Sequence, residues 1–212
     1  MGHVFLEMTM TVDGFTAGPG VSLEHPLGIG GEEVHEWTRG ASGPAEVGLG
    51  PEGAADAAPD EVDLSVIARR FDTTGAFVIG RRTFDVGEPP WGGDESFGHR
   101  PVFVVTSRPG EPVERDGSRF EFVTGGVSEA LERAMAAAHA ASVCILGGAD
   151  VARQSLTAGL VDEVRLHLVP VLLGGGSRLF PDASGQRVYL EPLGAEQGAL
   201  ATHLRYRVER ER

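Results

Sequence analysis

Three short apolar runs, at residues 76–80, 102–106 and 143–147, each end in residues whose chemistry suits phosphate binding. Arginine binds phosphate in a bidentate manner, hydroxyl groups donate hydrogen bonds to it, and glycine lets it approach the backbone. The residues are Gly80, Arg81, Arg82 and Thr83 at the first run, Thr106, Ser107 and Arg108 at the second, and Gly147, Gly148 and Ala149 at the third. One such group is ordinary turn chemistry, but three together predict a site for a ligand with two or three phosphates.

The charge of the chain limits its chemistry. It has 18 basic and 31 acidic residues in 212, a net charge of -13, which disfavours nucleic acid and anionic membranes as partners. All the basic residues are Arg, so Schiff-base chemistry on Lys and a Walker-type phosphate lysine are excluded. Ten acids and one Arg lie between Glu24 and Asp63, which leaves the predicted phosphate site outside the most acidic stretch.

The hydrophobic patterns predict an α/β fold. Continuous apolar runs of four or five residues are typical of strands buried on both faces, as in a parallel sheet covered by helices. Helices are predicted over about 60–73, capped by Asp60 or Asp63 with Leu64, Ile67, Ala68 and Phe71 on one face, over 127–141 with Ser128 as N-cap, and over 149–158. Further strands are predicted at 4–12, from 164 through Pro170 to 174, and at 204–208 as a half-exposed edge strand.

The length predicts one domain over residues 1–212, because 212 residues bury one full core and are too few for two large lobes. Residues 40–59 are rich in Gly, Ala and Pro and predict a flexible surface excursion. Cys144, the single cysteine, and the lack of a signal or membrane-spanning pattern predict a cytoplasmic protein. The parallel arrangement would bring the carboxyl ends of the three strands to one sheet edge, where ligands of such sheets bind.

Taken in order, several segments resemble the dihydrofolate reductase-like fold, and within it the reductase domain of riboflavin biosynthesis, which is the C-terminal domain of a bifunctional deaminase-reductase. The segments are Thr11-Val-Asp-Gly-Phe-Thr-Ala-Gly-Pro19, Val78-Ile-Gly-Arg-Arg-Thr-Phe84, Leu146-Gly-Gly148, Val161-Asp-Glu-Val164 and Pro170-Val-Leu-Leu-Gly-Gly-Gly176. The resemblance covers nearly the whole chain. It implies a three-layer α/β/α fold with a mostly parallel mixed central sheet and an antiparallel C-terminal edge strand.

The resemblance also implies a function. It implies a stand-alone NADPH-dependent reductase similar to 5-amino-6-(5-phosphoribosylamino)uracil reductase, acting on a small heterocyclic or carbonyl substrate, and a homodimer. The cofactor residues would be Val12, Ala17, Gly80, Arg81, Arg82, Thr83, Thr106, Ser107, Arg108, Gly147, Gly148 and Ala149. Residues 80–83 with Ser107 and Arg108 would lie near the adenosine and its 2′-phosphate, Gly147 and Gly148 at the pyrophosphate, and residues 13–17 near the nicotinamide.

The sequence departs from the relatives in two ways. One cysteine cannot form the zinc site of the deaminase domain, so deamination is excluded and no metal site is expected. The carboxylate that holds the pterin ring in dihydrofolate reductases cannot be matched by pattern to Asp60, Glu61, Asp63 or Asp72. Folate is therefore not the expected substrate.

Asp13 is the candidate proton donor, because the loop that it opens would face the nicotinamide. The alternative is an Asp-Gly turn in which this carboxylate bonds the backbone. The candidate substrate contacts are Phe15, Trp91 and Leu173, although Trp91 also fits an anchor for a Pro-rich loop. His167 and Cys144 are interpreted as buried packing residues. The alternative function is a non-catalytic nucleotide-binding or regulatory protein that keeps the NADPH pocket.

Overall fold

In a computed structural model of the chain, the structure describes residues 2–38, 58–87, 97–115, 117–180 and 187–209. The elements are β1 (Val4–Thr11), β2 (Phe15–Ala17), the 3₁₀ helix η1 (Glu32–Thr38), α1 (Glu61–Thr73), β3 (Thr74–Gly80), α2 (Arg81–Gly87), β4 (Val102–Val105), β5 (Val113–Arg115), β6 (Ser118–Val123), α3 (Gly126–Ala138), β7 (Ser142–Ile145), α4 (Ala149–Thr157), β8 (Glu163–Val169), β9 (Ser177–Arg178), β10 (Leu190–Gln197) and β11 (Thr202–Val208). Most of the predicted excursion at 40–59, and Trp91, lie outside the described residues.

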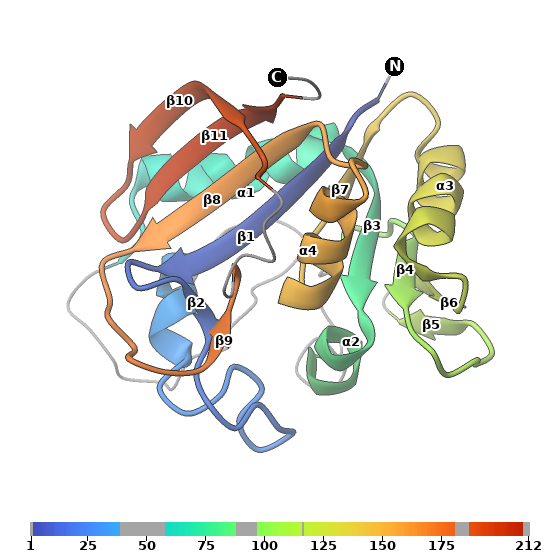
Figure 1. Cartoon of the computed structure of the whole chain (residues 1–212), viewed down its shortest axis with the longest axis horizontal. Coiled ribbons are helices and arrows are strands. Elements are labelled where there is room, and N and C mark those ends of the chain that lie inside the picture. Colours follow the sequence, from blue (N-terminus) through green and yellow to red (C-terminus); the bar gives the residue numbers. More distant parts are fainter. Residues whose placement is uncertain (1, 39–57, 88–96, 116, 181–186, 210–212) are drawn as a thin grey trace.

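Among the described residues, nine strands form one mixed sheet in the order β10-β11-β8-β1-β7-β3-β4-β6-β5 (Figure 1). The six central strands, β8 to β6, run parallel, whereas β11 is antiparallel to β8 and β5 to β6. The predicted α/β class and mostly parallel sheet are confirmed. The C-terminal strand β11 is antiparallel as predicted but does not form the edge, because β10 pairs along its outer side.

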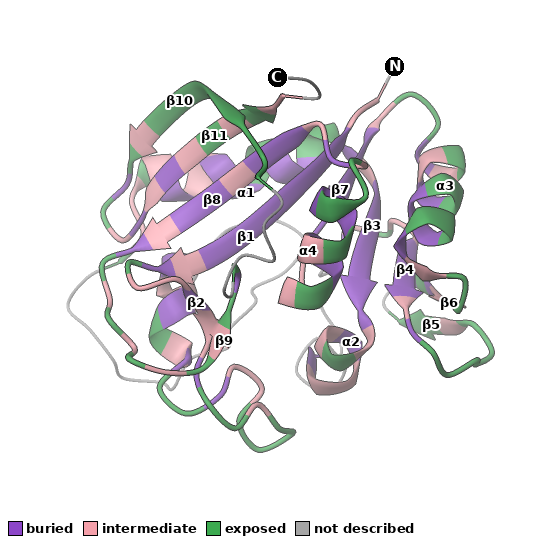
Figure 2. Cartoon of the chain, viewed as in Figure 1, coloured by how far each residue is buried: buried purple, intermediate pink, exposed green. Residues whose placement is uncertain are grey.

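Helices cover both faces of the sheet, which gives the predicted three layers (Figure 2). On one face, α3 and α4 pack on alternate residues of β1, β3 and β7, such as Leu6, Val78 and Ile145. On the other face, η1, α1 and α2 pack on the intervening residues, such as Phe5 and Phe77. Each central strand therefore has two apolar faces, which is why its sequence is a continuous apolar run rather than an alternating one.

The helix ends show where sequence patterns work and where they fail. Asp60 is the N-cap of α1, and a reciprocal bond from the Asp60 backbone to Asp63 completes a capping box. Ala68, which was predicted on the apolar face, is exposed. In α3 the predicted Ser128 cap is wrong, because the helix begins at Gly126 after Gly125, and it ends at Ala138 instead of residue 141.

Four further strands differ from the prediction. β8 ends at Val169 and does not continue through Pro170, since proline cannot donate to the ladder. The short strands β5 and β6 and the edge strand β10 have no counterpart in the predicted elements. β6 lies parallel to β4 and extends the sheet beyond the predicted phosphate-binding strands.

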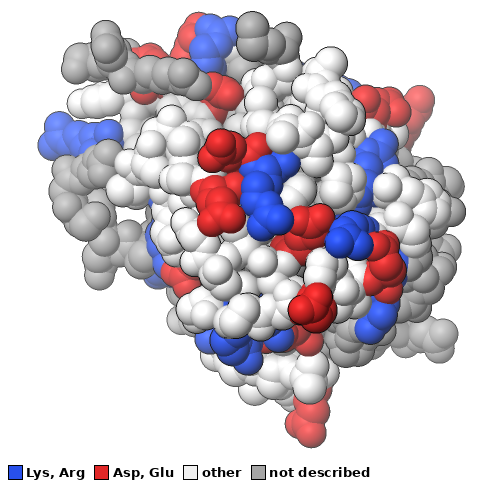
Figure 3. All heavy atoms as spheres, turned by 90° about the vertical axis from the view of Figure 1, so that its right-hand side faces the viewer, with Lys and Arg blue, Asp and Glu red and all other residues white. Residues whose placement is uncertain are grey.

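The surface around α3 and the β5–β6 edge carries acids and arginines side by side (Figure 3). Arg119 lies 2.9 Å from Glu114 and 3.1 Å from Glu121, and Arg133 lies 2.9 Å from the other oxygen of Glu121. This face therefore presents paired charges rather than a continuous basic surface. None of the described helices is long and apolar enough to span a bilayer.

Candidate active site

A cavity of about 1230 Å³ opens across the carboxyl ends of the central strands. It brings together the groups predicted at the three strand ends, and all the predicted cofactor residues except Val12 line it, together with Phe15. Val12 is 57% exposed, and neither Asp13 nor Leu173 lines the cavity. A strand order in which β3 lies between β7 and β4 explains this convergence, because residues that follow adjacent parallel strands share one sheet edge.

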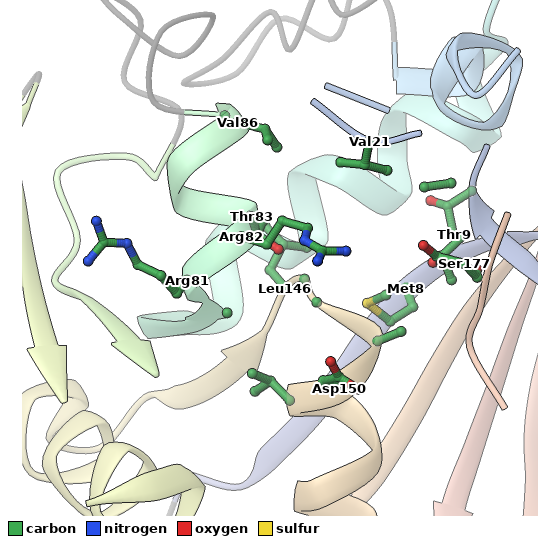
Figure 4. A pocket seen from close by; sticks show the side chains of 18 of the residues that line it. Met8, Thr9, Val21, Arg81, Arg82, Thr83, Val86, Leu146, Asp150 and Ser177 are labelled. Atoms are coloured by element: carbon green, nitrogen blue, oxygen red, sulfur yellow. Dashed lines mark hydrogen bonds between the residues drawn. The ribbon is translucent and has the colours of Figure 1, made fainter. Parts of the chain in front are cut away.

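The two adjacent arginines at the start of α2 point in different directions (Figure 4). Arg82 extends toward Met8 at the centre of the cavity, whereas the side chain of Arg81, which also lines the cavity, points to the opposite side. Arg81 donates from Nε to Asp85 at 2.6 Å, and its guanidinium lies 5.0 Å from the ring centroid of Phe122. Arg82 is thus the guanidinium available at the centre of the cavity.

Asp85 links two of the predicted phosphate-binding groups. Its Oδ1 accepts from Arg81, and its Oδ2 accepts from Nη2 of Arg108 at 2.8 Å. Arg108 also donates from its backbone N–H to the Thr106 hydroxyl at 3.0 Å, which shapes the turn after β4. The Asp85 carboxylate therefore lies between two guanidinium groups to which an anionic ligand could also bind.

The turn between β7 and α4 requires glycine. Gly147 and Gly148 have φ values of +139° and +83°, which side chains rarely adopt. A Cβ at Gly147 would lie 2.9 Å from Cγ2 of Thr83, and the Gly147 carbonyl accepts from Gly80 N–H at 3.1 Å. The ends of β3 and β7 therefore touch, and the N–H groups at the start of α4 border the cavity, where they favour an anion.

The end of the cavity beneath β1 and β8 carries buried charges. Glu7, only 1% exposed, accepts a 2.5 Å hydrogen bond from Nε of Arg70 on α1, and Nη1 of Arg165 lies 3.6 Å away. Burial raises the pKa of Glu7, but Arg70, His167 and Arg165 outweigh it and hold that pKa well below its usual range. Glu7, Arg70 and His167 all line the cavity.

Trp37 from η1 covers this buried cluster. Its ring centroid lies 4.3 Å from that of His167 and 5.1 Å from that of His203, and its indole N–H donates to Thr9 at 3.1 Å. His35 on the same helix is half-buried at the cavity wall, and burial, with Arg70 and His167 nearby, lowers its pKa to about 4. His35 is therefore neutral at pH 7.

Asp13 has a different setting from the one predicted for a proton donor. Its carboxylate accepts from the Thr11 hydroxyl at 2.5 Å and from the backbone N–H groups of Leu173 and Gly174 at 3.2 and 2.7 Å. These bonds lower its pKa, the one from Thr11 most. The contacts favour the alternative role of a turn residue, here one that ties the loop after β8 to the end of β1.

Sequence reasoning missed the charged pair of Glu7 and Arg70 and the neutral His35 near it. Glu7 did carry a signal, since it is the only acid among the apolar residues 4–12. A charged residue in a strand that is buried on both faces needs an opposite charge, and Arg70 is buried on the helix that packs over it. His167 was recognised as buried, but its contacts with other titratable groups depend on tertiary structure.

The sequence model of the RibD C-terminal domain family matches residues 2–204. The search of curated proteins gave no match. Among solved structures, a "putative riboflavin biosynthesis protein" from Shewanella sp. PV-4 has a TM-score of 0.64 and 18% sequence identity, with 99% of this chain and 100% of that chain covered. At this identity the structural match shows a shared fold.

Proposed function

Because the chain belongs to the RibD C-terminal domain family, we propose that it is an NADPH-dependent reductase that transfers a hydride to a small heterocyclic or carbonyl substrate. The substrate class that the family resemblance suggests is a uracil derivative of the 5-amino-6-(5-phosphoribosylamino)uracil type. The observation that carries the proposal is the convergence of three anion-binding strand ends in one cavity. Family membership supports a reductase, and the cavity supports a nucleotide cofactor.

The described residues fit a dinucleotide cofactor. The pyrophosphate would be held by the N–H groups at Gly148 and the start of α4, with Arg82 and the Thr83 hydroxyl beside it. The 2′-phosphate would be held by Arg108 and Ser107, with Arg81 behind them. At Gly147 a Cβ would lie 2.9 Å from Cγ2 of Thr83, so this turn beside the proposed pyrophosphate position requires glycine.

The cavity also has room for a second ligand. Its volume of about 1230 Å³ exceeds the ~300–1,000 Å³ typical of a single small-molecule site. The phosphate-binding residues follow β3, β4 and β7, whereas Glu7 and His167 lie on β1 and β8. We place the substrate at the β1–β8 end, between Trp37, Arg70 and the segment around Phe15.

Reduced nicotinamide supplies the hydride, so the protein needs to align the two ligands and supply a proton. Met8, Thr9 and Leu146 line the middle of the cavity between its two ends (Figure 4). Trp37 and Phe71 line the wall and limit access of water to the reacting groups. Arg70 and Glu7 offer a donor and an acceptor to the polar edge of a heterocycle.

The test is oxidation of NADPH at 340 nm across a panel of pyrimidines, pteridines, quinones and small carbonyl compounds. The reductase predicts a substrate-dependent loss of absorbance that Arg82→Gln slows by about tenfold or more, since a hydrogen bond to a charged group is worth ~1.5–3 kcal/mol. Arg133→Gln, on the exposed surface of α3 outside the cavity, is the matched control. NADPH binding without oxidation of any panel member would favour the non-catalytic alternative.

A further inference from the structure

Four buried titratable groups form a continuous chain that ends at the cavity. Oδ1 of Asp63 lies 2.9 Å from Nε2 of His203, Nδ1 of His203 lies 2.9 Å from Nδ1 of His167, and Nε2 of His167 lies 3.1 Å from Oε1 of Glu7. Each of the four residues is at most 3% exposed. The chain crosses α1, β11, β8 and β1, because His203 and His167 are register partners on paired strands.

These four residues make three hydrogen bonds to one another, but two neutral histidines supply only two hydrogens. Each of these three contacts needs one hydrogen, a neutral imidazole carries one N–H, and an ionised carboxylate carries none. If His203 donates to Asp63 and His167 donates to His203, then the bare Nε2 of His167 faces Glu7. The opposite direction leaves a bare Nε2 of His203 against Asp63. In either case one hydrogen is missing.

We infer that the Asp63–His203–His167–Glu7 chain holds one proton beyond those of two neutral histidines and delivers it to the substrate at the Glu7 end of the cavity. Such a chain satisfies all three contacts, as buried polar groups require. The inference rests on the proposed function for the identity of the acceptor, although the stored proton itself follows from the four residues alone.

The surroundings keep the extra proton away from Glu7 at rest. Arg70 and Arg165 face Glu7, and they favour its ionised form. Burial lowers the pKa of His167; the contact with Glu7 opposes this shift, and Arg70 and His203 add to it. Near Glu7 and His167, the described residues His35 and Cys144 are both neutral at pH 7, since the pKa of His35 is about 4 and burial raises that of Cys144. At the other end of these four residues, Asp60 lies beside Asp63.

The reaction balances with one shift along the chain. The hydride brings two electrons to a carbon of a C=N or C=O bond, and the reduced nicotinamide is oxidised. The hydrogen shared by His167 and Glu7 moves to the substrate nitrogen or oxygen, while the Nδ1 hydrogen of His203 moves to His167. Both histidines are then neutral. After the product leaves, water enters the open cavity and returns a proton to the Asp63–His203–His167–Glu7 chain.

The first test is ¹⁵N NMR of the histidines in ligand-free protein between pH 6 and 9. We expect the ring of either His167 or His203 to stay in the imidazolium form above pH 8. The variants His167→Gln and His203→Gln assign the signals of the two rings. Asp63→Asn should remove the imidazolium signal, because the amide NH₂ supplies the missing hydrogen. Asp60→Asn, which removes a charge at the same helix end but caps equally well, should keep it. Two neutral rings at pH 7.5 in the unmodified protein would overturn the inference.

The second test separates proton delivery from the proposed function. With a substrate from the NADPH panel, Asp63→Asn should slow single turnover by about 100-fold, in the range of general acid catalysis, while the Kd for NADPH stays unchanged. Turnover by Asp63→Asn at the unmodified rate would overturn delivery by the chain. An intact imidazolium signal with no NADPH oxidation in any assay would instead refute the proposed function.

Discussion

We propose that Asp85 controls how strongly the cavity binds a 2′-phosphate. It holds Arg81 and Arg108 at 2.6 and 2.8 Å, so the phosphate must compete with its carboxylate for these groups. We expect Asp85→Asn to tighten NADPH binding by about 3–10-fold, because a like charge is removed while both arginines stay. Fluorescence titration measures it, and NADH, which lacks the 2′-phosphate, serves as the internal control. Equal tightening of both cofactors would contradict this role.

The Glu7–Arg70 pair stabilises the fold only as a pair. Arg70→Met leaves the Glu7 carboxylate buried beside a single distant guanidinium, so we expect the free energy of unfolding to fall by ~3–5 kcal/mol. Arg69 lies on the same helix as Arg70 and forms an exposed 2.8 Å ion pair with Glu196 on β10. Arg69→Met breaks this pair and should lower the free energy of unfolding by at most ~1 kcal/mol. Urea denaturation of both variants measures the difference. Similar losses would show that burial does not matter here.

At the residue scale, sequence predicted which strand ends meet at the cavity better than it predicted the residues at the β1–β8 end. Gly80, Arg82 and Gly148 line the cavity, as expected for residues that follow adjacent parallel strands. The cluster around Glu7 could not be predicted, because its partners come from α1 and β8, far apart in the chain. The role of Asp13 depended on a contact with Gly174, which no local pattern reveals.

We propose that cofactor binding depends most on the turn between β7 and α4. Gly147→Ala places a methyl group against Thr83 and strains a φ of +139°, so we expect NADPH binding to weaken by more than tenfold. Gly159→Ala is the matched control, since its φ is +68° and its surroundings are open. It should lose comparable stability from strain but bind NADPH normally. Weak binding by both variants would point to general destabilisation.

Local patterns predicted the elements with strong signals and missed those defined by pairing. The buried strands β3, β4 and β7 and the helix α4 follow from apolar runs and from the glycines at their ends. β10 was missed because nearly all of it is exposed and includes Pro192, so only its pairing with β11 defines it. Ser128 failed as a cap because two glycines before it let α3 begin earlier.

Over the whole molecule, stability should fall in mild acid through His35. Its pKa is about 4 in the folded state and 6.5 when exposed, so the unfolded state binds more protons between these values. Stability from this group is complete above pH 6.5 and decreases toward pH 4, by ~2–3 kcal/mol at pH 4.5. Urea unfolding at pH 7.5 and 4.5 should show this loss, and His35→Leu should reduce it. An equal loss in the variant would contradict the assignment.

We propose that the chain forms a homodimer through the free edge of β10. Leu190 and Leu193 on this strand are 37% and 38% exposed, and its outer backbone groups have no strand partner among the described residues. Sedimentation velocity should give about twice the mass of 22.3 kDa, and Leu193→Glu should shift the protein to monomer. A monomer at 50 μM in the unmodified protein would refute this arrangement.

We propose that the cavity across β3, β4 and β7 binds NADPH through its phosphates. Titration of the unmodified protein with NADPH and NADH, followed by nicotinamide fluorescence, tests this binding most directly. We expect saturable binding of NADPH at micromolar concentration, at least tenfold tighter than binding of NADH. Equal affinity would remove the role of Arg108 and Ser107 at the 2′-phosphate, and no binding of either cofactor at high micromolar concentration would contradict the assignment of the site.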